Sequence, residues 1–438
     1  MTTARYLIAS INQFEVGRLQ EVSGLWRFQY SPEWLVNPQG FALSPHLPLV
    51  SETILDGASL RPVQWYFDNL LPEEGQRVLL AKDAKLDSAD AFGLLSWYGA
   101  ESAGSLALLL PEATIQSGEK LRPLTDEVLD KRIQQLPKAP LTQAAIKRMS
   151  LAGAQHKLAV VLKEGELFEP AGSTPSTHIL KPDHPDEDYA HSVINEWFVM
   201  KLAKRMGLDV PEVHRRYVPS PVYLIDRFDR FFLQSQGWQR QHVIDACQLL
   251  GLDKSFKYTQ GSVERLGEIA AACRSPAVAR TSLFRWLVFN VLVGNSDAHL
   301  KNLSFTISHE GIQLAPFYDL LSVAVYDTPA FEKQNWPKQT ELAWPILGVN
   351  RFADMSRQLL IDAGLKLKIS KSTSLRLIDS LCQQIATQAS MLYTEIQNDN
   401  NALMQIRPEL SARLAGESRC LRTILHAVIK DMVQKMMG

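Results

Sequence analysis

The pattern of apolar and polar positions changes along the chain. From Arg5 to about Leu110, short apolar runs such as ARYLIASI, WRFQY and GSLALLLP alternate with polar turns, which is typical of short strands mixed with brief helices. From about Ser262 onward, apolar residues recur at helical spacing. The last segment carries the clearest stripe, formed by Leu421, Ile424, Leu425, Val428, Ile429, Met432, Val433 and Met436. The pattern therefore predicts a small α+β part followed, at the end of the chain, by a helical part.

Between these parts, the sequence predicts several strands and one helix. The segment QHKLAVVLKEGELFEPAG turns at Glu164 and Gly165 and predicts a β-hairpin, and THILKP predicts a third strand. A helix is expected over residues 188–206, closed by Gly207 at the C′ position, and VYLIDRF favours another strand. A polar, proline-bearing stretch precedes this region. We therefore expect three parts, at residues 1–112, 145–260 and 261–438.

Composition narrows the class of protein. With 438 residues, 46% of them hydrophobic and 21% charged, the chain is long enough for two or three domains and is globular. A net charge of −1 argues against nucleic-acid binding by the bulk surface. The cysteines lie far apart, without metal-site spacing, which favours reduced structural thiols: Cys247, Cys273, Cys382 and Cys420. Neither a signal peptide nor an apolar run of about 18 residues is present, so we expect a cytoplasmic protein without a membrane span.

An apolar run, FRWLVFNVLV, leads directly into the polar stretch GNSDAHLKNL. A solvated turn after a core helix would explain this change, because Asn, Ser and Asp bond to the local backbone. A buried helix that holds a catalytic loop would explain it equally well. Residues elsewhere in the chain have to decide between the two interpretations.

Within this stretch, Asp297 and Asn302 have the spacing that protein kinases use between the catalytic base and a metal-binding Asn. Asp319 comes after a predicted hairpin, LSFTISHEGIQLAPFYD, whose ends return to each other. Asn302 and Asp319 could therefore bind one Mg²⁺ through oxygen atoms. The alternative for Asp319 is a helix N-cap before LLSVAV.

Upstream residues suit a nucleotide. Lys181 ends the apolar strand THILK, where its charge could meet the phosphates of ATP. Glu196, on the next helix, could orient this lysine or could lie on a solvated face. Ala152, Gly153 and Ala154 are small enough for backbone N–H groups to approach phosphates. The GxxxxGK[ST] and GxGxxG fingerprints are absent, as are GxSxG, HExxH and CxxC.

A set of characteristic stretches runs in order through nearly the whole chain: FALSPHLPL, FDNLLPE, FGLLSWYGAESAGSL, SLAGAQHK, THILKP, DRFDR, DACQLLG, NSDAHLKN and PFYD. In these stretches the sequence resembles the HipA-like serine/threonine kinases, the toxin components of bacterial HipA/HipB toxin–antitoxin modules. The resemblance implies an α+β, bilobal protein-kinase-like fold. Its parts would be a small N-terminal α+β subdomain, a β-rich N-lobe and a mostly helical C-lobe. ATP and Mg²⁺ are the implied cofactors.

The same resemblance implies roles for individual residues. Asp297 would be the catalytic base, and Asn302 and Asp319 would be the metal ligands. The nucleotide contacts would be Ala152, Gly153, Ala154, Gln155, His156, Lys157, Lys181, Asp226, Arg227, Phe228, His299, Lys301 and Tyr318. Residues 152–157 would form the phosphate loop and residues 226–228 the adenine hinge. Asp226 stands where the best-known members have Glu, and its shorter side chain can still accept a hydrogen bond.

The family also autophosphorylates a serine beside the phosphate loop, and Ser150 occupies that place. A phosphate there would add about −1.5 to −2 charges next to the phosphates of ATP. We therefore expect this modification to be inhibitory.

The resemblance further implies targets and partners. Family substrates include aminoacyl-tRNA synthetases, whose phosphorylation arrests growth and produces persister cells. The partner would be a dimeric HipB-like helix-turn-helix antitoxin that binds operator DNA, so that the complex represses its own operon. The implied activity is that of a protein-serine/threonine kinase, of the EC 2.7.11.1 class. Two alternatives stay open, a small-molecule kinase and a catalytically silent kinase fold that acts as a corepressor.

Overall fold

The computed structural model describes residues 4–113, 119–142, 145, 149, 151–172, 174–235 and 237–437. The chain folds into two compact units. Unit 1 consists of Met1–Pro182, Arg216–Lys257 and Leu303–Ala315, and unit 2 consists of Asp183–Arg215, Tyr258–Asn302 and Pro316–Gly438. Each unit thus combines separate stretches of the chain, whereas the three parts expected from the sequence follow one another.

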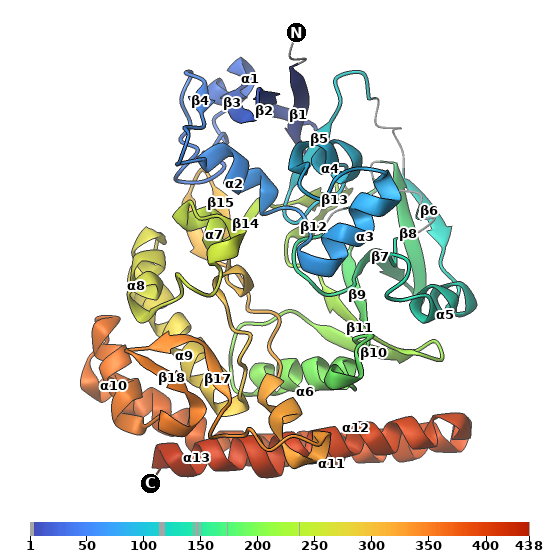
Figure 1. Cartoon of the computed structure of the whole chain (residues 1–438), viewed down its shortest axis with the longest axis vertical. Coiled ribbons are helices and arrows are strands. Elements are labelled where there is room, and N and C mark those ends of the chain that lie inside the picture. The colour runs from blue at the N-terminus through green and yellow to red at the C-terminus, as the bar shows by residue number, and fades with distance from the viewer. Residues whose placement is uncertain are drawn as a thin grey trace. The chain divides into compact units, whose positions relative to one another are not determined.

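Among the described residues, unit 1 begins with a five-stranded antiparallel sheet in the order β4-β3-β2-β1-β5 (Figure 1). Its strands are β1 Arg5–Ile11, β2 Phe14–Val22, β3 Leu25–Tyr30, β4 Ile54–Leu55 and β5 Leu106–Leu109. The accompanying helices are α1 Pro32–Val36, α2 Pro62–Asp68, α3 Glu74–Ala84 and α4 Ala91–Tyr98. Alternate residues of β1, namely Leu7, Ala9 and Ile11, are buried, because successive side chains of a strand point to opposite faces. The short strands and brief helices expected at the start of the chain are present.

A second sheet has the order β10-β11-β9-β7-β8-β6, and its strands lie in unit 1 except for the first three residues of β10, which belong to unit 2. Its elements, with the neighbouring helix, are β6 Glu119–Pro123, α5 Asp126–Gln134, β7 Leu158–Lys163, β8 Glu166–Gly172, β9 His178–Pro182, β10 Val213–Tyr217 and β11 Pro221–Asp226. The β7–β8 hairpin turns at Glu164 and Gly165, whose φ angles are +52° and +84°, as the sequence predicted. Leu158, Leu180 and Leu224 form part of the core of this sheet.

Smaller elements complete unit 1. They are β12 Arg230–Leu233, β13 Gly237–Arg240, β14 Val243–Asp245, α7 Ala246–Leu250, η2 Lys254–Phe256, β15 Ser304–Ser308 and β16 Gly311–Leu314. Strands β15 and β16 pair in antiparallel fashion from Phe305↔Leu314 to Ser308↔Gly311. This pairing is the hairpin that the sequence predicted between Asn302 and Asp319.

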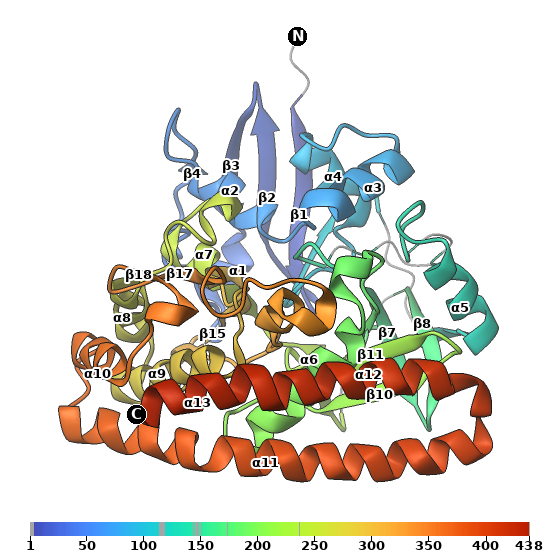
Figure 2. The same cartoon turned by 60° about the horizontal axis from the view of Figure 1, so that its bottom comes forward.

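Unit 2 is mainly helical. Its longer elements are α6 Ser192–Arg205, α8 Val263–Ala272, α9 Pro276–Val293, β17 Glu341–Ile346, β18 Val349–Arg351, α10 Arg357–Lys366, α11 Lys371–Ile406, α12 Ser411–Thr423 and α13 Lys430–Met437. Short 3₁₀ turns connect them at η1 Glu187–Tyr189, η3 Leu300–Asn302, η4 Val323–Asp327, η5 Pro329–Phe331, η6 Phe352–Asp354 and η7 Pro408–Leu410. Helix α11 runs alongside α12 and α13 (Figure 2). Gly207, with a φ of +73°, follows the C-cap of α6 as expected.

The end of the chain shows one departure from a plain helix. Between α12 and α13, residues Ile424–Ile429 (η8) wind as a π-helix, which the apolar stripe alone did not reveal. The stripe nevertheless faces the core, since Ile424, Val428 and Met432 are fully buried. All four cysteines are buried and none of them forms a disulfide. Within the described part of the chain, no helix has both the length and the apolar character required to cross a membrane.

Candidate active site

The loop that follows α9 is largely buried, which argues against a solvated turn. The exposed fractions of Asn295, His299, Lys301 and Asn302 are 3%, 8%, 6% and 6%. The side chain of Asp297, by contrast, is 44% exposed. The loop therefore presents one acidic side chain to solvent on an otherwise enclosed backbone, which fits the interpretation of a scaffolded catalytic loop.

Helix α9 ends at Gly294, and this glycine sets where the loop begins. Its φ is +66°, in the left-handed region, and the N–H of Asn295 returns to the carbonyl of Asn290 at 2.9 Å. A methyl group added at Gly294 would lie 2.6 Å from Val428 Cγ1 and 2.7 Å from Ala324 Cβ. Both the backbone turn and the close packing therefore require glycine at this position.

Asn295 holds the loop through both ends of its side-chain amide. Its Nδ2 donates to Asn290 Oδ1 at 2.8 Å and to the Asp319 carbonyl at 3.4 Å, and its Oδ1 accepts from the N–H of Asp297 at 3.1 Å. Asn290 is fixed in turn, because its Nδ2 donates to the Trp286 carbonyl at 2.8 Å. One buried amide thus joins the end of α9, the loop and the segment of Asp319.

Asp297 is restrained at its backbone and accessible at its carboxylate. Nδ2 of Asn302 donates to the Asp297 carbonyl at 2.9 Å. The hydroxyl of Tyr258 donates to Oδ1 of Asp297, and Nε2 of His299 lies 4.0 Å from the same oxygen. The ring of Tyr258 packs edge-on against His299, with ring centroids 4.9 Å apart. The carboxylate can therefore accept a proton from a hydroxyl that reaches it.

The segment of Asp319 returns to the loop, as the predicted hairpin required. The Tyr318 hydroxyl donates to the Lys301 carbonyl at 2.8 Å, and Asn295 contacts the Asp319 carbonyl. Asp319 itself has a φ of +52°, a conformation that Asp and Asn adopt more readily than most residues. The next helical turn, η4, has Ser322 at its N-cap, so Asp319 does not have the capping role of the alternative interpretation.

Asn302 and Asp319 have the chemistry that a magnesium ion requires. Nδ2 of Asn302 donates to the Asp297 carbonyl. The side-chain oxygen of Asn302 is the atom that suits a hard cation. Asp319 offers a carboxylate on the segment that Asn295 and Tyr318 tie to the loop. The two residues therefore fit a Mg²⁺ ion, and their role as ligands stays a prediction.

Lys181 and Glu196 lie in different units. Lys181, in β9, is 4% exposed and stands opposite Tyr223 of β11, with its Nζ 5.7 Å from the ring centroid. Glu196, in α6, is 3% exposed, which rules out a solvated helix face. The proposed pairing of these two residues stays a prediction.

The predicted phosphate loop, residues 152–157, makes a distinctive set of contacts within unit 1. Gly153, with a φ of +101°, forms an isolated parallel β-bridge with Pro72, and its carbonyl accepts from the N–H of Glu73 at 3.2 Å. Nζ of Lys157 donates to the Ala152 carbonyl at 2.6 Å. The loop is therefore bonded both to itself and to the start of α3. Ser150 lies outside the described residues, so its phosphorylation stays a prediction.

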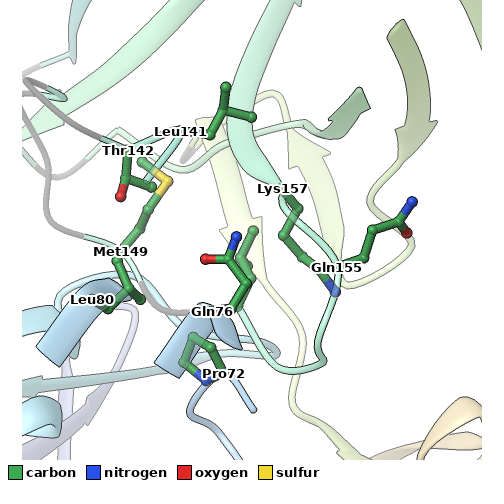
Figure 3. Close-up of a pocket in the computed structure, with 9 residues that line it drawn as sticks. Pro72, Gln76, Leu80, Leu141, Thr142, Met149, Gln155 and Lys157 are labelled. Atoms are coloured by element: carbon green, nitrogen blue, oxygen red, sulfur yellow. The ribbon is translucent and has the colours of Figure 1, made fainter. Parts of the chain in front are cut away.

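A small pocket lies beside this loop (Figure 3). It is lined by Pro72, Gln76, Leu80, Leu141, Thr142, Met149, Leu151, Gln155 and Lys157. Gln76 of α3 also hydrogen-bonds Nδ1 of His156. Two of the predicted contact residues, Gln155 and Lys157, thus face a pocket that α3 helps to form, and His156 is held by the same helix.

In the predicted hinge, the side chains of Asp226 and Arg227 already have partners in unit 1. Oδ1 of Asp226 lies 3.0 Å from Nε2 of His178, its cross-strand neighbour. The side chain of Arg227 is 1% exposed and pairs with Asp229 at 2.6 Å and with Glu101 at 3.3 Å. Burial alone would lower the pKa of Arg227, but these carboxylates raise it, so the guanidinium remains charged. The side chain of Arg227 is therefore not suited to an adenine contact. Phe228 is partly exposed.

Sequence reasoning did not single out several residues that build this site. Asn295 carried a signal that could have been used, because an Asn that accepts from the N–H two residues later is a common turn motif. Tyr258 and Trp344 carried no sequence signal that pointed to the site. Trp344 donates through Nε1 to the Ala298 carbonyl at 3.0 Å and so supports the loop from a distant part of the sequence.

Comparison with known proteins first defines the class. The family model for the HipA-like C-terminal domain matches residues 149–389, and the model for the HipA N-terminal domain matches residues 7–109. The serine/threonine-protein kinase toxin HipA of Shewanella oneidensis is 32% identical over 76% of this chain and 79% of its own length. The putative kinase Y4mE of Sinorhizobium fredii is 34% identical over 82% of this chain and 86% of its own length.

A solved structure agrees with the sequence matches. In the complex of Shewanella oneidensis HipA, HipB and operator DNA, the matched chain has a TM-score of 0.76 and 25% identity, with 98% of this chain and 99% of that chain covered. This chain therefore belongs to the HipA family and has its α+β, protein-kinase-like fold. Because its relatives are named kinases, a kinase activity that uses ATP is supported in general terms.

Proposed function

We propose that this chain is an ATP- and Mg²⁺-dependent serine/threonine protein kinase and the toxin of a toxin–antitoxin module. The observation that carries this proposal is the solvent-accessible carboxylate of Asp297 on a loop that buried amides hold in place. Phosphoryl transfer needs little covalent chemistry from the protein, so a well-positioned base and charge neutralisation supply most of the catalysis. Asp297 would accept the proton of the serine or threonine hydroxyl as it attacks the γ-phosphate.

Other residues would position the nucleotide. Mg²⁺, held by Asn302 and Asp319, would supply positive charge to the transferring phosphate. Lys181 and the backbone of the phosphate loop would bind the phosphates. The hinge residues would face the adenine, with the Arg227 side chain serving a structural role because it is buried among carboxylates.

The substrate and partners of the module belong to the same proposal. We infer a translation component, such as an aminoacyl-tRNA synthetase, as the phosphorylated protein and growth arrest as the result. A HipB-like antitoxin dimer would neutralise the kinase and carry it to operator DNA for repression. The HipA of the Shewanella complex was solved together with HipB and operator DNA, which supports this arrangement.

The central test is the Asp297→Asn variant. Removing a general base should lower phosphoryl transfer by about a hundredfold to ten-thousandfold, while Mg²⁺-dependent ATP binding stays near that of the parent. Transfer is measured with labelled ATP and ATP binding by calorimetry. Asp399→Asn, an exposed site on α11, is the matched control and should keep parental activity. A variant as active as the parent would show that Asp297 is not the base.

The acceptor is identified by comparing phosphopeptides from cells that express the parent or Asp297→Asn. Sites found only with the parent, on serine or threonine of a translation protein, support the proposal. Label that appears only in metabolites would indicate a small-molecule kinase. Antitoxin binding without any ATP binding would indicate a silent corepressor.

A further inference from the structure

Tyr258 is a neighbour of Asp297 for which the proposed function has no use. It lies at the start of a tight turn, in which the N–H of Gly261 donates to the Tyr258 carbonyl at 3.0 Å. Its side chain extends to Asp297, where the hydroxyl donates to Oδ1, and its ring lies edge-on to His299. Tyr258 is 37% exposed and the Asp297 side chain 44%, so the contact is made at the edge of the protein.

The turn that carries Tyr258 and the loop that carries Asp297 share one support. Added to Gly261, a methyl group would lie 2.6 Å from Trp344 Cδ1, so the turn packs closely on that indole. The same indole donates to the Ala298 carbonyl at 3.0 Å. Trp344 therefore fixes the backbones on both sides of the hydrogen bond, while Tyr258 itself is partly exposed.

This contact has the same chemistry as the hydrogen bond from a substrate hydroxyl, the group that accepts the phosphate, to a general base. A general base receives its proton from a hydroxyl at a heavy-atom distance of roughly 2.6–3.2 Å. The phenol of Tyr258 is a hydroxyl that donates to a carboxylate oxygen of Asp297, which is the bond that a serine, a threonine or a water molecule would have to make.

We propose that Tyr258 is a placeholder for the acceptor hydroxyl, which occupies Asp297 until a substrate displaces it. The inference rests on the proposed function, because it requires Asp297 to be the base. Since one hydroxyl replaces another on the same oxygen, displacement by a bound substrate is readily reversible. Water, which arrives without other binding contacts, displaces the phenol less effectively, so the placeholder suppresses wasteful hydrolysis of ATP.

A purely structural role for this hydrogen bond is less consistent with its surroundings. More than a third of each side chain is open to solvent, where water competes for both partners and a hydrogen bond contributes little to folding. The backbones on both sides are already held by Trp344, so the phenol is not needed to keep them in place.

The test is the Tyr258→Phe variant, which keeps the ring against His299 and removes only the hydroxyl. Mg²⁺-dependent ATP hydrolysis is measured as released inorganic phosphate without any added protein acceptor, so only transfer to water is counted and transfer to Ser150 is not. We expect about a threefold to tenfold faster hydrolysis, the range that one modest hydrogen bond gives, with an unchanged KM for ATP. Tyr393→Phe is the matched control, because Tyr393 bonds Ser418 elsewhere in unit 2 and should leave the rate unchanged.

The possible outcomes separate this inference from the proposed function. Hydrolysis by Tyr258→Phe that equals or falls below the parental rate overturns the placeholder role, and a slower rate with a shifted pH profile would show that Tyr258 orients the base. Phosphotyrosine at position 258, found by mass spectrometry, also overturns it, because the phenol would then be a substrate. If the parent transfers no phosphate from ATP to protein, or if Asp297→Asn transfers it equally well, the proposed function fails and the inference fails with it.

Discussion

The two loops that would carry the chemistry are held in different ways. In unit 2, buried amides of Asn295 and Asn302 bond the backbone around Asp297. In unit 1, the phosphate loop is held in part by Lys157, whose ammonium group lies on the Ala152 carbonyl. If Lys157 is to bind a phosphate, its ammonium group has to leave the Ala152 carbonyl. The amides of Asn295 and Asn302 can keep their hydrogen bonds throughout a reaction.

The difference indicates which loop is preorganised. A site whose first contacts are fixed by buried side chains costs little reorganisation when a substrate arrives. The loop around Asp297 meets this description, and the phosphate loop meets it only through its attachment to α3. We therefore expect changes near Asp297 to affect stability and turnover together, and changes near the phosphate loop to affect ATP affinity.

The largest effect is expected for Gly294→Ala. The substitution combines a left-handed φ with a methyl group 2.6 Å from Val428 Cγ1, so we expect the free energy of unfolding to fall by about 3 kcal/mol. Urea unfolding measures this change. In the control Gly348→Ala, φ is +87° but no atom lies within 4 Å of the added methyl group. Only the backbone strain should therefore lower the free energy of unfolding, by about 1 kcal/mol. Equal losses in both variants would show that the packing around Gly294 is loose.

Asn295→Asp tests the amide itself. The variant keeps an oxygen for the N–H of Asp297 but loses the donor to Asn290 Oδ1 and to the Asp319 carbonyl. We expect about 2 kcal/mol of lost stability and a tenfold or greater fall in kcat, because two buried acceptors lose their partner. Asn401→Asp makes the same chemical change at an exposed site of α11 and should be neutral. If Asn295→Asp keeps the kcat of the parent, the loop does not depend on this amide and is not preorganised by it.

We expect acid to lower the free energy of unfolding of unit 1. His242 is fully buried, with its ring nitrogens 2.9 Å from the Leu43 carbonyl and 3.0 Å from Ser105 Oγ, and burial lowers its pKa to about 4. Because the folded pKa lies below the ordinary value, neutral His242 contributes stability above about pH 6.5 that is lost as the pH falls towards 4. Between about pH 7.5 and about pH 5.5 we expect a loss of about 1 kcal/mol.

Urea unfolding at both pH values measures this loss. The acid-dependent loss should become smaller by about 1 kcal/mol in His242→Gln and stay unchanged in His309→Gln, which changes an exposed histidine of the same unit. An unchanged pH dependence in His242→Gln would assign the acid sensitivity to other groups.

The smallest effect is expected for Gln76→Ala, which removes the side chain that bonds His156. The phosphate loop keeps its other contacts, so we expect ATP binding to weaken by about threefold to fivefold with kcat unchanged. Calorimetry with ATP and Mg²⁺ measures the affinity, and the exposed Gln39→Ala serves as the control in unit 1. A fall in kcat at unchanged affinity would reverse the contrast drawn between the two loops.

Local patterns predicted the elements better than their assembly. The hairpin turning at Glu164 and Gly165, the helix closed by Gly207 and the hairpin before Asp319 all follow from turn chemistry and apolar periodicity, and the structure contains them. That each unit combines three separate stretches of the chain could not be predicted, because the pattern of apolar residues does not show which distant segments share a core.

The candidate site was predicted in part for the same reason. The spacing of Asp297 and Asn302 lies within one loop and can be read from the chain. The contact of Asp297 with Tyr258 joins positions 39 residues apart and left no local signature. Of the buried partners of Arg227, Asp229 is two residues away but Glu101 is 126 residues away, so its resemblance-based role as a nucleotide contact could not be separated from a structural one.

The π-helical turn at Ile424–Ile429 bears on how this chain should be aligned with other sequences. Such a turn is equivalent to one extra residue in an α-helix. A relative that lacks this residue would keep the same inward face, so a single-residue gap here is structurally neutral. The same gap placed inside α13 would turn the residues beyond it by about 100° and would move Met436 off the buried face.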